Sequence, residues 1–463
     1  MSGSSRLDSK DPMKEPCLHV IPVGNSYMST TPRTLAKLAH SPPASVQVKM
    51  RSFLNLPFFS KASCPWFSPY LFLFYLAFLF VALRIFGVVS DLQYFFQSVR
   101  LLSRQPTHSI LGDDGRLRVD QNYEFLITIF SDLHYGEEED GWGIDQDINS
   151  TKVVRDILGW EDSNLVVLNE NSTAYLDTVV APLVKNKIHW ASTYGNHDSQ
   201  FNLSREALFV EESKYQLSYT QHSPPGIDGI TNYYLLIYPP IDSKSPNDPL
   251  AILWFFDSQG GAPFQASSDS ETIPNYVTPS IVDWFTSTSS QLTGKYGRSL
   301  PSLAFVHIPP TAFLEKQEEA FVDPDVYLPR YPGLNADVPL AAQGDGTQDK
   351  LFMEALVGME GLHSVYSGHD HGDAWCADFP KEGVVKGRED GNGPFLCFCK
   401  HSGYGGYGTW NREARVLRLG FGMEGEEEMQ VDTWVRMEDG DVIQMVGLNA
   451  TYGTDIYPSY DGQ

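Results

Sequence analysis

Carboxylate and imidazole side chains stand close together in Asp132-Leu-His134, directly after the apolar and β-branched run from Leu126 to Phe130. The run predicts a buried strand, and residues two apart on an extended backbone point to the same side. Asp132 and His134 are therefore expected to project together at the carboxyl end of that strand. Such a pair suits a divalent or trivalent metal ion, although a capping Asp and a surface His are the alternative for this stretch alone.

Three later stretches carry similar residues at predicted strand ends: Gly195-Asn-His-Asp198, His307 before Ile-Pro-Pro, and Gly368-His-Asp-His-Gly372. The last has the same two-residue spacing of ligand-type side chains as the first stretch. Each of them alone also fits an ordinary turn or a buried histidine. Because open α/β sheets bind ligands at the carboxyl ends of their strands, the recurrence of the pattern predicts one shared metal site.

The elements that must position these residues alternate between strand and helix from residue 122 onwards. Apolar runs predict strands, and i, i+3, i+4 spacing predicts helices. Strands are predicted at 126–130, 165–168, 188–193, 234–238, 251–256, 303–306, 364–366, around 416 and 433, and at 442–446, and helices at 176–184, 279–296 and 351–357. Residues 311–346 are rich in Pro, Gly and Asp, which predicts a long surface loop.

The order of these motifs resembles that of the calcineurin-like metallophosphoesterases, over roughly residues 122–450. The stretch Gly368-His-Asp-His-Gly-Asp-Ala-Trp375, followed by Tyr404-Gly-Gly-Tyr407, is similar to the purple-acid-phosphatase-like or Ser/Thr-phosphatase-like branch. The resemblance implies an α/β (α+β) fold, a four-layer sandwich of two mixed β-sheets flanked by helices. It also implies a metal-dependent hydrolase of phosphate monoesters, with phosphoproteins among the candidate substrates.

The resemblance also implies a role for each ligand-type residue. Those that match ligands of a first metal ion are Asp132, His134 and His371, and those that match ligands of a second are Asn196, His307 and His369. His197 matches a proton-donating histidine, and Asp198 is a candidate to orient it. Mixed His, Asn and Asp ligands fit Fe, Zn or Mn better than Ca. Two such ions would bind the phosphate oxygens and activate a water for in-line attack.

One motif of the family is missing from the chain. The family has a Gly-Asp at the end of the second strand, and its Asp bridges both metal ions. Here Leu165-Val-Val-Leu-Asn-Glu-Asn-Ser-Thr173 passes from strand to helix without it, as if a short block after Asn169 were absent. Glu170 is the nearest carboxylate and a candidate for a substitute bridge. We therefore expect a weakly bound second ion and low phosphatase activity.

Two other interpretations compete with an active phosphoesterase. One is a catalytically silent relative that acts as a binding module at a membrane, and the other is an unrelated metal-binding interaction domain. Metal stoichiometry separates an active enzyme from a silent relative, because a dimetal enzyme holds two ions and a silent relative holds one or none. The order of the motifs disfavours the unrelated domain.

The region before the predicted catalytic domain has a different composition. Residues 1–64 contain eight Lys/Arg and three Asp/Glu and predict a disordered basic tail. Trp66 to Val89 is nearly continuous in apolar residues, about the 20 residues needed to cross a bilayer, and predicts a transmembrane anchor over 65–90. The remaining predicted segments are a linker at 91–121, the catalytic domain at 122–450 and a tail at 451–463. Four Asn-x-Ser/Thr sequons after the anchor are compatible with a lumenal or extracellular catalytic part of a single-pass protein.

Charge and cysteine content limit the partners further. The formal net charge of −25 argues against a nucleic-acid-binding surface, and it does not choose among phosphorylated substrates. The five cysteines do not form a disulfide framework or a zinc knuckle. Cys376 with Cys397 or Cys399 is the one pairing expected in an oxidising compartment.

Overall fold

A computed structural model describes the chain within the unit Arg100–Gln463. The described residues are 114–138, 141–169, 175–198, 203–267, 270–322, 324–334, 343–344, 347–379, 393–422 and 429–457. The predicted basic tail and the predicted anchor at 65–90 lie outside these ranges. Within them, no helix is both long and apolar enough to cross a membrane.

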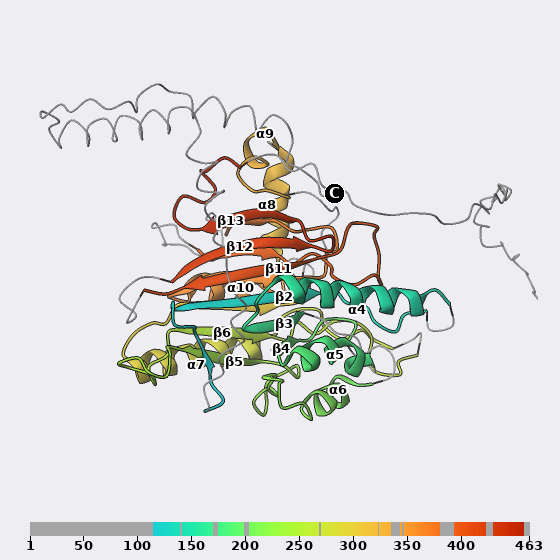
Figure 1. Ribbon diagram of the computed structural model, residues 1–463, viewed down its shortest axis with the longest axis horizontal. Helices are drawn as coiled ribbons and strands as arrows, with labels where there is room; N and C mark the ends of the chain where they lie inside the picture. Colours follow the sequence, from blue (N-terminus) through green and yellow to red (C-terminus); the bar gives the residue numbers. More distant parts are fainter. Residues whose placement is uncertain are drawn as a thin grey trace, which may run out of the picture. The chain divides into compact units, whose positions relative to one another are not determined.

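Two mixed β-sheets form the centre of this unit (Figure 1). The six-stranded sheet has the order β13 (Val442–Leu448), β12 (Gln430–Met437), β11 (Glu413–Gly420), β2 (Glu124–Ser131), β3 (Leu165–Asn169) and β4 (His189–Thr193). The seven-stranded sheet has the order β1 (Leu117–Arg118), β5 (Tyr233–Tyr238), β6 (Ala251–Phe256), β7 (Ser302–Val306), β8 (Leu362–Ser367), β10 (Phe395–Phe398) and β9 (Cys376–Asp378). Within the first sheet β2, β3 and β4 are parallel, and within the second β6, β7 and β8 are parallel.

Helices cover the outer faces of both sheets. Figure 1 shows α4 and α5 beside the β2–β4 part of the six-stranded sheet. The described helices are α4 (Gly143–Trp160), α5 (Leu176–Asn186), α6 (Arg205–Glu212), α7 (Pro279–Tyr296), α8 (Thr311–Val322), α9 (Pro324–Tyr327) and α10 (Lys350–Gly358). The arrangement confirms the expected architecture of two mixed sheets flanked by helices.

Strand β2 shows how alternation along a strand builds this sandwich. Phe125, Ile127 and Ile129 lie in the core between the two sheets, whereas Phe130 lies in the cluster formed with α4 and α5. Side chains of a strand point alternately to its two faces, so an apolar run can serve both layers. Full burial of each such side chain contributes about 1.5–3 kcal/mol, which fixes the strand in register and thereby fixes the residues at its end.

The seven-stranded sheet follows the same rule with aromatic side chains. The rings of Trp254 and Phe256 on β6 each lie 5.0 Å from the ring of Phe285 on α7. Phe255, on the opposite face, stacks on Tyr233 and Phe305 with centroid distances of 4.6 and 5.1 Å. The contacts hold β5, β6 and β7 side by side and align their ends.

The sequence prediction was wrong for part of residues 311–346. The segment contains α8 and α9 where a long surface loop was expected. Ala312 and Phe313 are fully buried, and the ring of Phe313 packs 4.8 Å from that of Phe398. Polar residues are frequent in α8, but a buried strip on one face is sufficient for a helix that packs against a core.

Other elements were either confirmed or not anticipated. The predicted strands and the three predicted helices are all present. Helix α4 was not predicted, although Val153, Val154 and Ile157 have helical spacing and are buried. The predicted bridge from Cys376 is formed with Cys397, while Cys399 is a buried free thiol.

Candidate metal centre

The carboxyl ends of strands from both sheets meet at one place. Asp132 and His134 follow β2, Asn196 follows β4, His307 follows β7, and His369 and His371 follow β8. The Oδ1 atom of Asp132 lies 3.7 Å from Nε2 of His307 and 3.7 Å from Nε2 of His371. The structure therefore brings together residues as distant in the sequence as Asp132 and His371, as the shared position at strand ends predicted.

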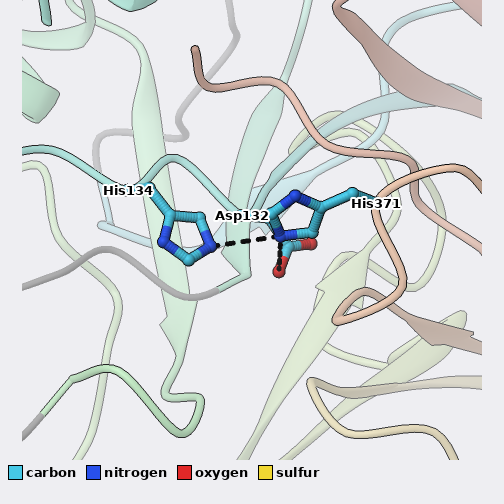
Figure 2. Close-up of side chains that lie close together, drawn as sticks. All are labelled: Asp132, His134 and His371. Carbon is cyan, nitrogen blue, oxygen red and sulfur yellow. Dashed lines mark hydrogen bonds and ion pairs between the residues drawn. The ribbon is translucent and has the colours of Figure 1, made fainter. Parts of the chain in front are cut away.

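Asp132, His134 and His371 form a group that we call the first half-site. Their ligand-type atoms all lie within 4.8 Å of one another, and the three residues are buried. The two Nε2 atoms are 3.2 Å apart, and Figure 2 shows them facing each other, with the Asp132 carboxylate next to the His371 ring. Two imidazole nitrogens and a carboxylate oxygen at these separations fit the donor set of Zn, Fe or Mn.

Each imidazole of the first half-site is held through its Nδ1 atom. Nδ1 of His134 bonds to Oε1 of Glu137 at 2.8 Å, and Nδ1 of His371 bonds to the carbonyl oxygen of Tyr407 at 2.7 Å. Both partners are acceptors, so each Nδ1 donates, and in the neutral imidazole this leaves the lone pair on Nε2, which faces the other ligands. Outer partners of this kind orient histidine ligands in metal sites.

Asn196, His307 and His369 form the second half-site, on the other side of Asp132. Oδ1 of Asn196 lies 3.1 Å from Nε2 of His307, and the rings of His307 and His369 meet edge to face at 5.3 Å. The backbone N–H of His369 donates to both oxygens of Asp132, at 3.2 and 3.0 Å. The group is thus packed against the same carboxylate as the first half-site.

The predicted catalytic residues lie beside these ligands. The ring of His197 is 4.8 Å from the ring of His134 and steeply inclined to it, with an interplanar angle of 61°. Asp198 is fully buried, and its Oδ2 accepts the backbone N–H of Gly195 at 2.6 Å. This bond closes the turn that carries Asn196 and His197.

The backbone is unusual at three of the ligand-type positions. Asp132, His134 and His369 have φ angles of 51°, 48° and 77°. Non-glycine residues rarely adopt this left-handed region, and each costs of order 1–3 kcal/mol that the surrounding structure must offset. The three departures concentrate at the site, where the chain must turn sharply after a strand to present a side chain.

Burial controls the protonation of the centre. It lowers the pKa of His371 to about 3 and that of His369 to about 4, and it lowers the pKa of His307 well below the ordinary range. Burial also raises the pKa of the Asp132 carboxyl. Near neutral pH these imidazoles are uncharged, so their lone pairs are available to an ion without loss of a proton.

A neutral amide occupies the end of β3, where the family has its bridging region. Oδ1 of Asn169 is 3.1 Å from Nδ1 of His307, and its carbonyl oxygen accepts the N–H of Asp132 at 3.1 Å. Its Nδ2 atom is buried and has no hydrogen-bond partner in the described part of the chain. Glu170, the candidate for a substitute bridge, lies outside the described residues.

Sequence reasoning missed the residues that support the ligands. Glu137 and Asn169 contact ligand-type histidines through side-chain oxygens, and Tyr407 does so through its backbone carbonyl. Glu137 was detectable in principle, because it stands three residues after His134 in the same loop. Tyr407 belongs to the stretch that resembles the family, but its 36-residue separation from His371 gave no indication of the contact.

The two flanked sheets and the buried cluster of Asp132, His134 and His371 are those expected of a metallophosphoesterase-like protein, and comparison with known proteins finds phosphatase-like relatives. The chain is 25% identical over 363 residues to "Probable inactive purple acid phosphatase 29" of Arabidopsis thaliana, and the aligned region covers 70% of this chain and 85% of that protein. It is 25% identical over 372 residues to "Probable inactive purple acid phosphatase 14" of the same plant, covering 72% and 86%. It is also 26% identical over 293 residues to phosphatase DCR2 of Saccharomyces cerevisiae, covering 57% and 47%.

No protein-family model matches the chain. The relatives nevertheless confirm its resemblance to the purple-acid-phosphatase-like branch of the calcineurin-like metallophosphoesterases. Two of the three carry the word "inactive" in their names, so similarity to these proteins supports the family and leaves turnover to be established by experiment.

Proposed function

We propose that the chain is a metal-dependent phosphoesterase that hydrolyses phosphate monoesters, with activity reduced by loss of the bridging Asp motif. The observation that carries the proposal is the buried cluster of Asp132, His134 and His371, whose ligand-type atoms lie within 4.8 Å of one another. Similarity to phosphatases over most of the chain supports the same reaction class.

The first half-site would hold one ion, and Asn196, His307 and His369 would hold a second, more weakly bound one. When bound, such ions supply an activated water and neutralise charge on the phosphate oxygens. The residues of the chain provide the rest. Asp132 offers a carboxylate oxygen to both half-sites. His197, beside His134, would give a proton to the leaving oxygen, a typical role of an imidazole.

The weakness of the second site follows from charge. Two cations a few ångströms apart repel each other strongly, and a bridging carboxylate offsets that repulsion. In the described residues, the end of β3 supplies the neutral side chain of Asn169 at this place. An ion in the second half-site would therefore bind with lower affinity, and the attacking water would be placed less well.

Metal analysis combined with a phosphatase assay tests the proposal. The purified full-length chain is loaded with Zn, Mn or Fe, dialysed, and assayed for bound metal and for hydrolysis of p-nitrophenyl phosphate. We expect one tightly held ion, a second that is lost on dialysis, and slow metal-dependent hydrolysis. Absence of any bound ion would overturn the proposal.

A catalytically silent binding module is the second candidate, favoured by the missing Gly-Asp motif. In this case the chain would bind an ion and a phosphorylated partner without turnover. Calorimetric titration of the metal-loaded chain with inorganic phosphate separates the two, because binding of phosphate with no hydrolysis of any monoester would support the silent module.

The membrane anchor predicted at residues 65–90 is a separate proposal about location. It would place the site near a membrane and the phosphorylated substrate on the lumenal or extracellular side. Extraction of the full-length protein with alkaline carbonate tests it. Retention in the membrane pellet is expected, and release without detergent would contradict an anchor.

A further inference from the structure

The glycine-rich segment 403–408 approaches the first half-site too closely for ordinary side chains. A Cβ atom added at Gly406 would lie 2.3 Å from Cε1 of His371 and 3.0 Å from Nε2 of His134, and one added at Gly405 would lie 2.4 Å from the carbonyl oxygen of His134. Real Cβ atoms do not approach other atoms so closely. The segment is therefore a wall of the site, in direct contact with two ligand-type imidazoles.

Tyr407 extends this wall over His371 in three ways. Its carbonyl oxygen accepts from Nδ1 of His371, and its hydroxyl oxygen accepts the backbone N–H of His371 at 2.9 Å. Its ring also stacks on the imidazole, with centroids 4.0 Å apart and an interplanar angle of 18°. The orientation of His371 is consequently set by where the glycine-rich segment lies.

Glu137 connects that segment to the other imidazole. One carboxylate oxygen, Oε1, bonds to Nδ1 of His134 at 2.8 Å, and the second, Oε2, accepts the backbone N–H of Gly406 at 2.7 Å. The side chain is half-buried, with 24% of its surface exposed. Both partners are donors, so only a carboxylate long enough to reach both can make the two bonds at once.

We infer that Glu137 is a positioning residue, which holds His134 and the Gly405-Gly406-Tyr407 turn in the one arrangement that directs His134 and His371 to a shared ion. This inference rests on the proposed metal site. Beyond that site, the inference states that a carboxylate supports the ligands of the first half-site from behind. A single side chain, that of Glu137, thereby sets the orientation of two histidines. Outer partners of metal ligands typically change metal affinity by about 10- to 100-fold when they are replaced.

Three variants in the full-length chain separate position from charge. Glu137→Gln removes the charge and leaves a single acceptor oxygen, so it keeps one of the two bonds. Glu137→Asp keeps the charge but is one methylene shorter and cannot span both partners. Glu138→Gln is the matched control, because it removes the same charge from the next residue, whose side chain is exposed.

The measurements are the affinity for Zn by competition with a chromophoric chelator and the visible absorption spectrum of the Co-loaded protein. Glu137→Gln and Glu137→Asp are each expected to bind Zn about 10- to 100-fold more weakly than wild type and to shift the Co spectrum. Glu138→Gln should match wild type in both. Circular dichroism and thermal unfolding in chelator show whether each variant is folded before metal is added.

The outcomes distinguish this inference from the proposed function. If wild type binds Zn and the Glu137 variants bind it equally well, the inference is overturned while the metal site stands. The inference also fails if Glu137→Asp matches wild type, or if Glu138→Gln weakens binding as much as Glu137→Gln, since charge alone would then explain the effect. If wild type binds no ion, the metal site and this inference both fail.

Discussion

The two half-sites share one carboxylate but differ in what stands behind their ligands. In the first half-site, a carboxylate and a backbone carbonyl fix His134 and His371 through their Nδ1 atoms. In the second, the neutral amide of Asn169 contacts His307 through Nδ1. Imidazoles are present on both sides, but Nδ1 of His134 contacts a carboxylate and Nδ1 of His307 contacts an amide. We therefore expect the two half-sites to differ in ion affinity, because the charge around the ligands contributes to it.

The largest effect should come from Asp132, whose Oδ1 both half-sites share. Asp132→Asn removes the charge and keeps the size of the side chain, and Asn tolerates the left-handed backbone at this position. We expect loss of both ions and of all metal-dependent hydrolysis. Metal content after dialysis and the rate with p-nitrophenyl phosphate measure it. A variant that still holds one ion would show that the half-sites are independent.

His197 should affect the rate and leave both half-sites loaded. His197→Ala removes the proposed proton donor beside His134 and is expected to slow turnover by about 10²- to 10⁴-fold. Metal content should remain that of wild type, because His197 is not among the matched ligands. Parallel loss of metal and rate would instead make His197 a ligand.

Replacing one histidine of each half-site in turn tests directly whether the two half-sites differ in ion affinity. His134→Ala should release the tightly held ion, with affinity falling by about 100-fold or more. His307→Ala should leave that ion in place and abolish only the weak second binding event. Isothermal titration with Zn resolves the two events. Equal losses in both variants would contradict a difference between the half-sites.

Restoring the missing motif should reduce the difference between the half-sites. Insertion of Gly-Asp and a short connecting loop after Asn169 is expected to raise stoichiometry from one ion toward two, and to raise the rate roughly tenfold or more. An insertion of the same length with Gly-Asn is the control for loop length. Glu170→Gln in the wild-type background tests the substitute bridge, because loss of a second ion in that variant would identify Glu170 as the bridge.

The sequence was sufficient to predict that the ligand-type residues lie at strand ends, and the apolar pattern of the preceding strand is strongest for two of them. These are Asp132 after β2 and His307 after β7. The supporting residues could not be predicted in the same way. Tyr407 lies 36 positions from His371 and belongs to no strand end, and part of its contact is made by a backbone carbonyl, which carries no sequence signal. Asn169 follows the same strand pattern, but its neutral amide did not indicate a contact with His307.

The two helices that the sequence analysis did not predict were missed for a related reason. Helix α8 buries Ala312 and Phe313 on a narrow face. The surrounding residues are mostly polar, so the average composition of the segment did not indicate a buried helix. Helix α4 has a clear buried face, but it follows an acidic stretch of sequence that obscured the start of the helical pattern. Composition averages over a segment, whereas packing depends on a few positions along it.

The first half-site takes its ligands from strands of both sheets, and this affects how the protein unfolds. His134 follows a strand of the six-stranded sheet and His371 follows a strand of the seven-stranded sheet, 237 residues further along the chain. A bound ion would act there as a reversible cross-link that closes a very long loop, which restricts the unfolded chain. Removal of the ion by a chelator should therefore lower the melting temperature. It should also increase amide hydrogen exchange first in the loops at the strand ends where the two sheets meet, before exchange increases in the hydrogen-bonded strands of either sheet.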